Sequence, residues 1–387
     1  MIEEKNRASI ERTAHAAFII NGFCATAAGV LVNILQQRYQ LPYTLVGTLL
    51  AALSLGNLLA SLLSGLLAGR LGTRGVVLLF SGGAAIGYGM MVLSGKAALL
   101  WLAFFLVGIA KGGTVNSCNV LMGLAARDRT RSMNLMNAGF ALGALSCPFI
   151  VRFMSGGTLP WQAAFWTMAV LGLVNWLCFA LAPIARDLGK SSGSRASEWG
   201  FLRTGRFWML TGVMFFQQAS EVTVTSMAVT YFQGTGLLSA SASGFVITLV
   251  WLCMLLGRLI IAHYAVRVRS PFALLSWMGV GCLLSFGLML VTHSTALALL
   301  GMALYGLSVA GVFPTTIAAA GSQLSNQSMG VILPVAGIGA VVMPAICGRV
   351  AEAAGLRVGM SCVLAAIVGL IVMSALCRRF IPCEESA

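Results

Sequence analysis

The segment IARDLGKSSGSRASEWGFLRTGR, residues 184–206, is the only long polar interruption in this chain of 387 residues. On both sides of it the sequence consists of apolar runs longer than about 18 residues, the length at which a helix can span a bilayer. Strands of a membrane barrel would instead alternate in segments of about 10 residues. The sequence therefore predicts an all-α membrane protein whose helices are divided into two sets by residues 184–206.

The composition agrees with a chain that lies mostly in lipid. Hydrophobic residues make up 59% of it and charged residues only 9%, whereas a soluble domain carries about 25% charged residues. A large soluble catalytic domain is excluded. The formal charge of +14 is spread a few residues to each loop, so we interpret it as an orientation signal and expect no nucleic-acid binding.

Charged and turn-rich breaks divide the apolar sequence into twelve predicted transmembrane helices. Their ranges are 14–36, 44–69, 75–93, 97–123, 133–154, 161–183, 207–232, 240–262, 271–292, 295–321, 327–350 and 356–380. This predicts an N-terminal six-helix half at 1–183, a cytoplasmic linker at 184–206 and a C-terminal six-helix half at 207–387. With the N-terminus inside, 18 of the 24 basic residues fall in cytoplasmic segments, Arg258 among them. The bias predicts that both termini are cytoplasmic, in the cytoplasmic (inner) membrane.

Two short motifs occur once in each half. LGALSCP (142–148) in the fifth predicted helix and IGAVVMP (338–344) in the eleventh share the pattern GAxxxP at an offset of 196 residues. AGRL (68–71) follows the second helix, and LGRL (256–259) lies near the end of the eighth. Two matches at corresponding helices favour duplication, and parallel six-helix repeats that alternate access to a central site are a transporter architecture. We therefore expect pseudo-symmetric halves.

The segment GLLAGRLGTRG (65–75) resembles the loop between the second and third helices of the major facilitator superfamily. The resemblance implies the major facilitator fold. It also implies a role in conformational change for Gly65, Gly69, Arg70, Gly72 and Arg74. Gly69 stands where the family has an aspartate, so the latch that this acid forms in the family has no counterpart here.

Within that superfamily the chain is similar to the fucose permease group of sugar:proton symporters. The similar segments are GIAKGGTVNSCNVLM (108–122), RSMNLMNAGFALGAL (131–145) and FFQQASEVTVTSMAVTYF (215–232). The resemblance implies symport of a sugar with a proton. However, the acids of that group in the first and fourth helices align with Gly29 and Gly113, so the group's own proton route is not implied.

Glu221 is the only acid deep within a predicted helix. It lies about 14 residues into the seventh span, near the bilayer midplane at a rise of about 1.5 Å per residue. A charge at that depth costs about 2.5–3.5 kcal/mol, which makes an ionisable residue there a functional candidate. Removal from water favours the neutral form of a carboxyl group, so Glu221 is the predicted proton carrier. The alternative is a static glutamate, held neutral or fixed by a cation or hydrogen bonds.

Lys111 is the only basic residue at comparable depth, about 14 residues into the fourth helix. In the resembled superfamily the first, fourth, seventh and tenth helices line the cavity, which implies that Lys111 can face Glu221 across it. The alternative is that Lys111 packs against a neighbouring helix and meets backbone carbonyls or an asparagine. Both interpretations stay open.

Polar side chains in several helices are candidate substrate ligands. One stripe on the seventh helix, at three- and four-residue spacing, consists of Gln217, Gln218, Glu221 and Thr225. Further candidates are Asn137, Asn116, Asn119 and Asn21, together with Trp251 and Tyr305 for stacking on a sugar ring. Amides and hydroxyls bind a polyol by donating and accepting hydrogen bonds. The alternative for these residues is polar contact between helices.

The sequence predicts no metal site and no cofactor. Its ten cysteines form no CxxC pair, and the three histidines lie far apart in sequence. No serine hydrolase set, HExxH or phosphate-binding loop is present, so an enzyme is disfavoured.

We therefore predict a secondary active transporter for a small polar solute, a sugar or sugar-like molecule, with proton coupling through Glu221 and Lys111. The alternatives are an uncoupled facilitator, an exporter of drug-like or anionic metabolites for which Lys111 supplies the counter-charge, and a non-transporting membrane sensor of the same fold. The expected partners are the solute, protons and membrane lipid, and the expected state is a monomer.

Overall fold

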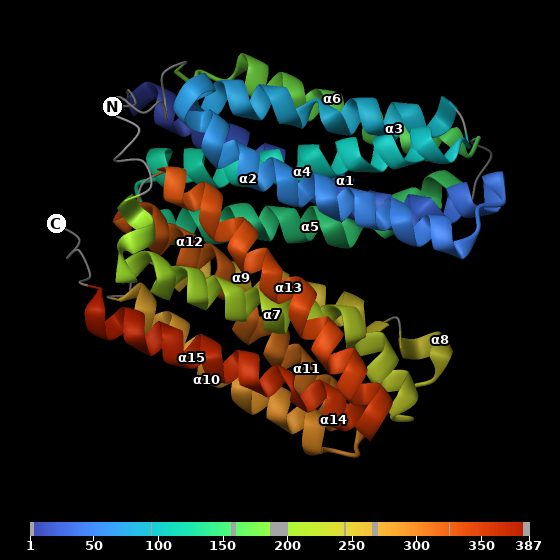
Figure 1. The fold of residues 1–387 in the computed structure, drawn as a ribbon, viewed down its shortest axis with the longest axis vertical. Helices are drawn as coiled ribbons and strands as arrows, with labels where there is room; N and C mark the ends of the chain where they lie inside the picture. Colours follow the sequence, from blue (N-terminus) through green and yellow to red (C-terminus); the bar gives the residue numbers. More distant parts are fainter. Residues whose placement is uncertain are drawn as a thin grey trace. The chain divides into compact units, whose positions relative to one another are not determined.

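The computed structural model describes residues 4–93, 95–155, 160–185, 200–243, 245–264, 270–324 and 326–381. These residues are helical almost throughout, and no strand occurs among them (Figure 1). The helices before the predicted linker are α1 (Glu4–Tyr39), α2 (Tyr43–Ser81), α3 (Gly83–Leu93), α4 (Ala97–Ala125), α5 (Arg129–Ser155) and α6 (Gln162–Leu181). Most of the linker, residues 186–199, lies outside the described part of the chain.

The helices after the linker begin with a short 3-10 turn, η2 (Gly200–Arg203). They continue with α7 (Gly205–Gly234), α8 (Ala240–Ser243), α9 (Phe245–Tyr264), α10 (Pro271–Val291), α11 (Thr295–Val309), α12 (Val312–Gln323), α13 (Asn326–Ala354), α14 (Leu356–Ser361) and α15 (Val363–Phe380). Side-chain capping is visible at α10, where the Ser270 hydroxyl accepts the backbone N–H of Ala273 and Pro271 occupies the first helical position.

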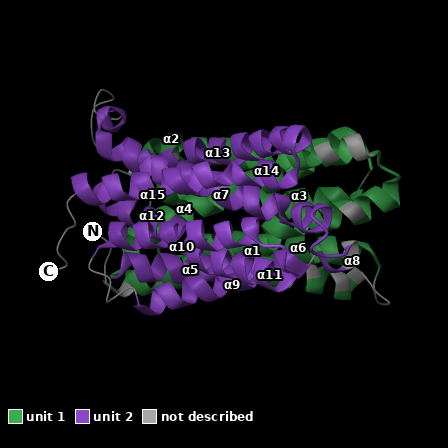
Figure 2. Ribbon diagram, turned by 90° about the horizontal axis from the view of Figure 1, so that it is seen from below, with its two compact units in different colours: residues 1–127, 139–193, 329–331 green, residues 128–138, 194–328, 332–387 purple. Residues whose placement is uncertain are grey.

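The chain divides into two compact units, coloured in Figure 2. Unit 1 consists of residues 1–127, 139–193 and 329–331, and unit 2 of residues 128–138, 194–328 and 332–387. Helix α5 is shared, because its first turns up to Ala138 group with unit 2 and the remainder groups with unit 1.

Ten described helical segments are long and apolar enough to span a membrane. One of them, Thr48–Leu93, covers two predicted helices, since α2 continues past the predicted loop and only Gly72 departs from helical geometry there. The predicted seventh helix is present as α7 but is not among the ten, because the polar residues at 217–225 lower its hydropathy. The ten segments cover eleven of the predicted helices, because one segment covers two, and α7 is the twelfth.

The surfaces of the helices are those of a protein that is solvated by lipid. Large apolar side chains are exposed along them, such as Phe153 at 81%, Leu181 at 83% and Trp277 at 72%. A soluble monomer rarely exposes such side chains over a wide area. The exposed apolar side chains and the ten spans together indicate an integral membrane protein.

In unit 1, α4 packs against α1, α2 and α3. Glycines make the contact between α4 and α2 close: a β-carbon on Gly108 or Gly112 would overlap the backbone carbonyl of Leu53 or Asn57. Small residues at such crossings let helix backbones approach within a membrane. The buried hydrophobic core of unit 1 includes Tyr88, whose ring is fully buried.

In unit 2, α15 runs beside α7 and α10, and α11 lies against α9 and α10 (Figure 1). Glycines again mark one contact, since a β-carbon on Gly257 of α9 would lie 2.7 Å from the Leu307 carbonyl oxygen of α11. The buried core includes Tyr231, Phe286 and Tyr305.

The GAxxxP repeat corresponds to a repeated packing contact. A β-carbon on Gly143 of α5 would overlap the Ile19 carbonyl oxygen of α1, and one on Gly339 of α13 would overlap the Phe215 carbonyl oxygen of α7. The two glycines are 196 residues apart, and so are Ile19 and Phe215. Each unit therefore contains the same glycine contact at the same place in its repeat.

Candidate functional site

Glu221 lies on α7 of unit 2, half-buried, with part of the predicted polar stripe around it. The Gln217 side chain is fully buried and donates from Nε2 to Glu221 Oε2. Thr225 donates its hydroxyl to the Glu221 backbone carbonyl at 2.8 Å, so its proton is used within the helix. Gln218 is half-buried on the neighbouring face of α7. The spacing of four residues brings Gln217, Glu221 and Thr225 together, as one turn of a helix requires.

Arg258 is the cation of this site, and the sequence analysis did not identify it as such. We counted it among the cytoplasmic basic residues, but the structure places it within α9 with only 4% of its surface exposed. It donates from Nε to the Ala310 carbonyl at 3.1 Å and from Nη1 to the Asn137 carbonyl at 2.9 Å. Its charge also acts on Glu221. The available signal was its position inside the predicted helix 240–262, in an otherwise apolar run.

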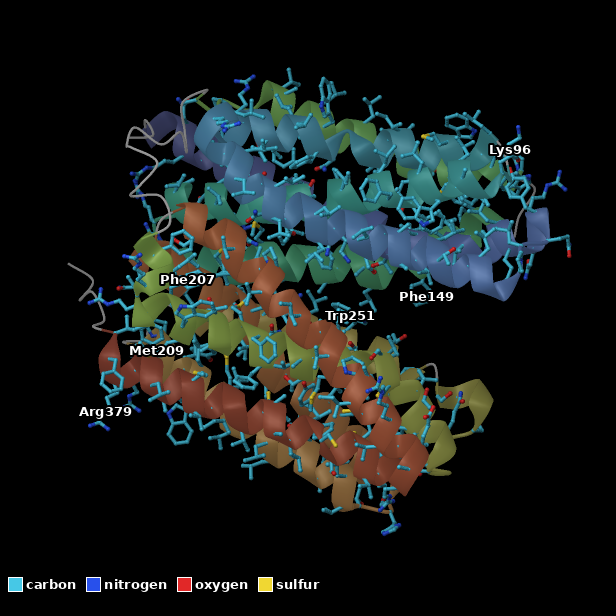
Figure 3. All side chains as sticks on the ribbon, in the orientation of Figure 1. Lys96, Phe149, Phe207, Met209, Trp251 and Arg379 are labelled. Atoms are coloured by element: carbon cyan, nitrogen blue, oxygen red, sulfur yellow. The ribbon has the colours of Figure 1, made fainter. Side chains whose placement is uncertain are left out.

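The predicted aromatic residues belong to the core next to Glu221. Tyr305 of α11 is fully buried against Phe286 at 5.7 Å between ring centroids, and its hydroxyl is buried without a hydrogen-bond partner. Trp251 of α9, labelled in Figure 3, is half-buried and packs on the same core.

Asn137 lies in the part of α5 that belongs to unit 2. Its side chain is 5% exposed and donates from Nδ2 to the Met133 carbonyl at 2.9 Å, while its backbone carbonyl holds Arg258. Asn134, one turn earlier, reaches Thr315 Oγ1 of α12 at 3.3 Å. The backbone of Asn137, more than its amide, connects this residue to the Glu221 site.

Lys111 lies on α4 of unit 1 and borders a small cavity of about 10 Å³, room for about one water molecule. Asn21 of α1, Thr114 of α4 and Asn175 of α6 also line the cavity. Each of these three has a buried polar atom without a hydrogen-bond partner, namely Asn21 Nδ2, Thr114 Oγ1 and Asn175 Oδ1. The sequence analysis missed Asn175, whose signal was a single asparagine in the apolar helix 161–183.

The other two candidates on α4 are buried elsewhere in unit 1. Asn116 donates from Nδ2 to the Ser61 carbonyl of α2 at 3.1 Å, which is the polar contact between helices that we considered as the alternative. Asn119 is 1% exposed, and both its amide atoms lack a hydrogen-bond partner. Neither residue lines the Lys111 cavity.

The segment 65–75 lies within α2, which departs from helical geometry at Gly72 and then continues to Ser81. Gly72 has φ 70° and ψ 164°, a conformation that is open to glycine and strained for other residues. Arg74 donates to the Ala180 carbonyl at 2.8 Å and the Ile184 carbonyl at 3.2 Å, which ties this turn to the end of α6. Gly65 is buried, Gly69 is half-buried and Arg70 is exposed.

Two glycines stand where the fucose permease group has acids, and their surroundings differ. A β-carbon on Gly29 would meet nothing within 4 Å, whereas one on Gly113 would overlap the side chain of Phe80. Packing of α4 against α2 therefore disfavours any side chain at position 113. Because Lys111 belongs to unit 1 and Glu221 to unit 2, the predicted pairing between them stays a prediction.

The described residues contain no group of three or more His, Cys, Asp or Glu side chains that could hold a metal ion. The polar groups are amides, hydroxyls, one carboxyl and one cation at the site of unit 2, and amides, a hydroxyl and one cation at the cavity of unit 1. These groups bind polar solutes and protons by hydrogen bonding and charge.

Comparison with known proteins places these sites in a known fold. The family model of the Major Facilitator Superfamily matches residues 14–344. The structure is similar to that of the E. coli fucose:proton symporter FucP, with a TM-score of 0.81, 12% identity, and coverage of 96% of this chain and 99% of that one. It is also similar to the human organic anion transporter MFSD10 (TETRAN), with a TM-score of 0.75, 16% identity and coverage of 97% and 100%. The proton:xylose symporter XylE gives a TM-score of 0.75, 14% identity and coverage of 98% and 97%. No curated protein sequence matches this chain.

Proposed function

This chain belongs to the major facilitator superfamily, as its resemblance predicted, and from that premise we propose that it is a secondary active transporter of a small polar, sugar-like solute, with proton coupling through Glu221. The observation that carries the proposal is the position of Glu221. It is the only carboxyl group in the middle of a described spanning helix, the buried amide of Gln217 donates a hydrogen bond to it, and the charge of the buried Arg258 lies near enough to act on it. Ionisable groups at that depth are costly and are retained for function.

The proton chemistry follows from the three groups. When Glu221 is ionised, Gln217 donates to it and the Arg258 charge stabilises it. When Glu221 is protonated, the Arg258 charge loses its counter-charge and relies on its hydrogen bonds to the Ala310 and Asn137 carbonyls. The two protonation states thus differ in charge balance at one buried point. Such a difference is what a carrier needs in order to couple proton movement to a change of conformation.

A sugar-like solute is supported by the polar groups near Glu221. Gln217 Oε1 is buried without a partner, so it offers an acceptor, and the half-buried Gln218 adds an amide. Tyr305 and Trp251 add aromatic rings. Two of the proteins with similar structures, FucP and XylE, are symporters of a proton with fucose and with xylose. At 12% and 14% identity these neighbours support the class of solute and not its identity.

The proposed arrangement has an N-terminal half at 1–183, a linker at 184–206 and a C-terminal half at 207–387, which alternate access to the solute. Excluding the buried Arg258 lowers the cytoplasmic basic count from 18 to 17 of 24 and leaves the bias in place. We therefore keep both termini on the cytoplasmic side of the inner membrane. The proposed functional unit is a monomer that needs no cofactor.

The test uses purified protein in proteoliposomes. A thermal-shift screen of sugars first identifies a bound solute, because ligand binding raises apparent stability. The radiolabelled solute is then measured in counterflow and in uptake driven by a pH gradient. We expect Glu221→Gln to retain counterflow, because glutamine keeps the polarity of the side chain. We expect its gradient-driven accumulation of solute to fall at least about tenfold, because glutamine cannot release a proton.

The control is Glu352→Gln, which changes an exposed carboxyl group near the end of α13 and should leave both assays unchanged. Full accumulation by Glu221→Gln would overturn the coupling role. Absence of counterflow in the wild-type protein with the bound solute would overturn transport itself and favour a sensor.

A further inference from the structure

Lys111 is a half-buried cation for which the described part of unit 1 supplies no counter-charge. No charged group among the described residues offsets the cost of removing its ammonium from water. The described acids of unit 1 are Glu4 and Glu11, and even Glu11 precedes Asn21 by ten residues of α1, about 15 Å along the helix. An unpaired charge in this position is costly. A bound anion would supply the counter-charge that the described residues of unit 1 lack.

Glu221 already has a cation within its own unit. Arg258 is buried in unit 2, and its charge acts on Glu221. Glu221 therefore has a nearby cation that is not Lys111. This separates the two candidate residues and leaves the Lys111 site available for another anionic group.

The cavity beside Lys111 is built for a polar atom. Asn21, Thr114 and Asn175 come from three helices, all are more than nine-tenths buried, and each has an unpaired polar atom at the cavity. Buried polar atoms normally have partners, and leaving one unpaired costs about 1–3 kcal/mol. The Asn21 amide and the Thr114 hydroxyl are donors that join the Lys111 ammonium in favouring an anion, whereas Asn175 Oδ1 is an acceptor that suits the ammonium itself.

The small size of the cavity limits what can enter. About 10 Å³ admits one atom the size of a water oxygen, so a single oxygen of a carboxylate can enter while the rest of the ligand stays outside. The small side chains of Ala25, Ala84 and Ala110 line the remainder and add no competing charge.

We propose that the cavity formed by α1, α4 and α6 binds a carboxylate group of the transported solute, with Lys111 as its counter-charge and Asn21 and Thr114 as hydrogen-bond donors. The inference rests on the proposed transport function and narrows its solute to a sugar acid or a similar polar carboxylate. A free halide has the same charge and a similar size, and it is the other source that the experiment distinguishes.

The experiment measures the thermal unfolding midpoint of the purified full-length protein in detergent at constant ionic strength. Sodium acetate and sodium formate are the anionic probes, acetamide is the neutral isostere of acetate, and sodium chloride tests the halide. We expect acetate and formate to raise the midpoint in a saturable way and acetamide to have no effect, since only the anions pair with Lys111.

Substitutions of cavity residues test whether the rise in the unfolding midpoint with acetate comes from binding at this cavity. Lys111→Arg should keep the response to acetate, whereas Lys111→Met should weaken it by about 10- to 100-fold, the loss of one charge-assisted contact. Thr114→Val should weaken it by about 2- to 10-fold, the loss of one neutral hydrogen bond. Without any anion, Lys111→Met should melt higher than the wild-type protein because it removes an unpaired buried charge. This last measurement also shows that the variant is folded.

Three results would overturn the inference. These are an equal response to acetate and acetamide, an acetate response that survives in Lys111→Met, and a saturable response to chloride without one to acetate. Glu221→Gln separates this inference from the proposed coupling: we expect it to bind acetate as the wild-type protein does, whatever its behaviour in the accumulation assay. Loss of acetate binding in Glu221→Gln would contradict the assignment of the anion to Lys111.

Discussion

The two units share a packing scheme and differ in charge. Asn21 and Gln217 are 196 residues apart, the offset of the glycine contacts at Gly143 and Gly339, so they occupy corresponding places on α1 and α7. Next to Asn21, unit 1 has a cation without an acid. One turn after Gln217, unit 2 has an acid with a cation. The two units thus share the contacts that hold helices together, and they differ in the polar groups beside them, which form two chemically different sites.

The AGRL and LGRL motifs show the same divergence. Arg70 of the first motif is exposed, whereas Arg258 of the second is 4% exposed and donates two hydrogen bonds to backbone carbonyls. Gly69 has open space around it, whereas Gly257 lies against α11. Similar sequence motifs in the two units therefore do not imply similar structural environments.

Arg258→Met should give the largest effect on stability. The substitution removes two charged hydrogen bonds and leaves the Ala310 and Asn137 carbonyls and Glu221 without this partner. We expect the free energy of unfolding to fall by about 2 to 4 kcal/mol. The measurement is denaturant unfolding of the purified protein in detergent micelles.

The matched control is Arg70→Met, the corresponding change in unit 1. Because Arg70 is exposed, we expect a change within about 0.5 kcal/mol. Equal losses of unfolding free energy in Arg258→Met and Arg70→Met would contradict the distinction between the motifs. An unchanged unfolding free energy in Arg258→Met would contradict it as well.

Alanine at the repeated glycines should give the next largest effect. In Gly143→Ala and Gly339→Ala the new methyl group would overlap the carbonyl oxygens of Ile19 and Phe215, so a helix must shift. We expect each to lower the free energy of unfolding by about 1 to 3 kcal/mol, with similar values in the two units. The same denaturant titration measures both.

The controls are Gly29→Ala on α1 and Gly337→Ala on α13, where the methyl group meets nothing within 4 Å. These two should be neutral or slightly stabilising, since alanine favours helix more than glycine does. A large loss at only one of Gly143 and Gly339 would show that the repeated contact is not energetically equivalent in the two units.

The fold could be predicted from the sequence because the lipid bilayer requires a simple pattern of apolar segments and polar breaks. Apolar runs of spanning length, interrupted by short polar breaks, predicted the helices, and the glycines of the GAxxxP motif, which suggested two similar halves, make the same contact in both units. The prediction of a separate loop at 70–74 was less accurate. A single residue, Gly72, makes that turn, and one residue changes the hydropathy pattern very little.

The candidate sites could be predicted only in part from the sequence. Glu221 and Lys111 stood out because each is a charge within an apolar run. The role of Arg258 and Asn175 depends on which helix faces they occupy and what those faces contact, and spacing along the chain does not give this. Asn116 shows the converse, since a residue that suits a ligand role donates to the Ser61 carbonyl of a neighbouring helix.

The smallest expected effect separates the glycines of the two motifs. Gly69→Ala adds a methyl group that meets nothing within 4 Å, so we expect it to stabilise the protein by about 0.4–1 kcal/mol through the helix preference of alanine and its smaller unfolded-state entropy. Gly257→Ala should instead destabilise, because its methyl group would lie 2.7 Å from the Leu307 carbonyl oxygen. Gly72→Ala, three residues after Gly69, should also destabilise, by about 1–3 kcal/mol, since φ there is 70°. If Gly69→Ala and Gly257→Ala change the unfolding midpoint in the same direction, the two motifs have equivalent surroundings and the divergence inferred from Arg70 and Arg258 does not extend to the backbone.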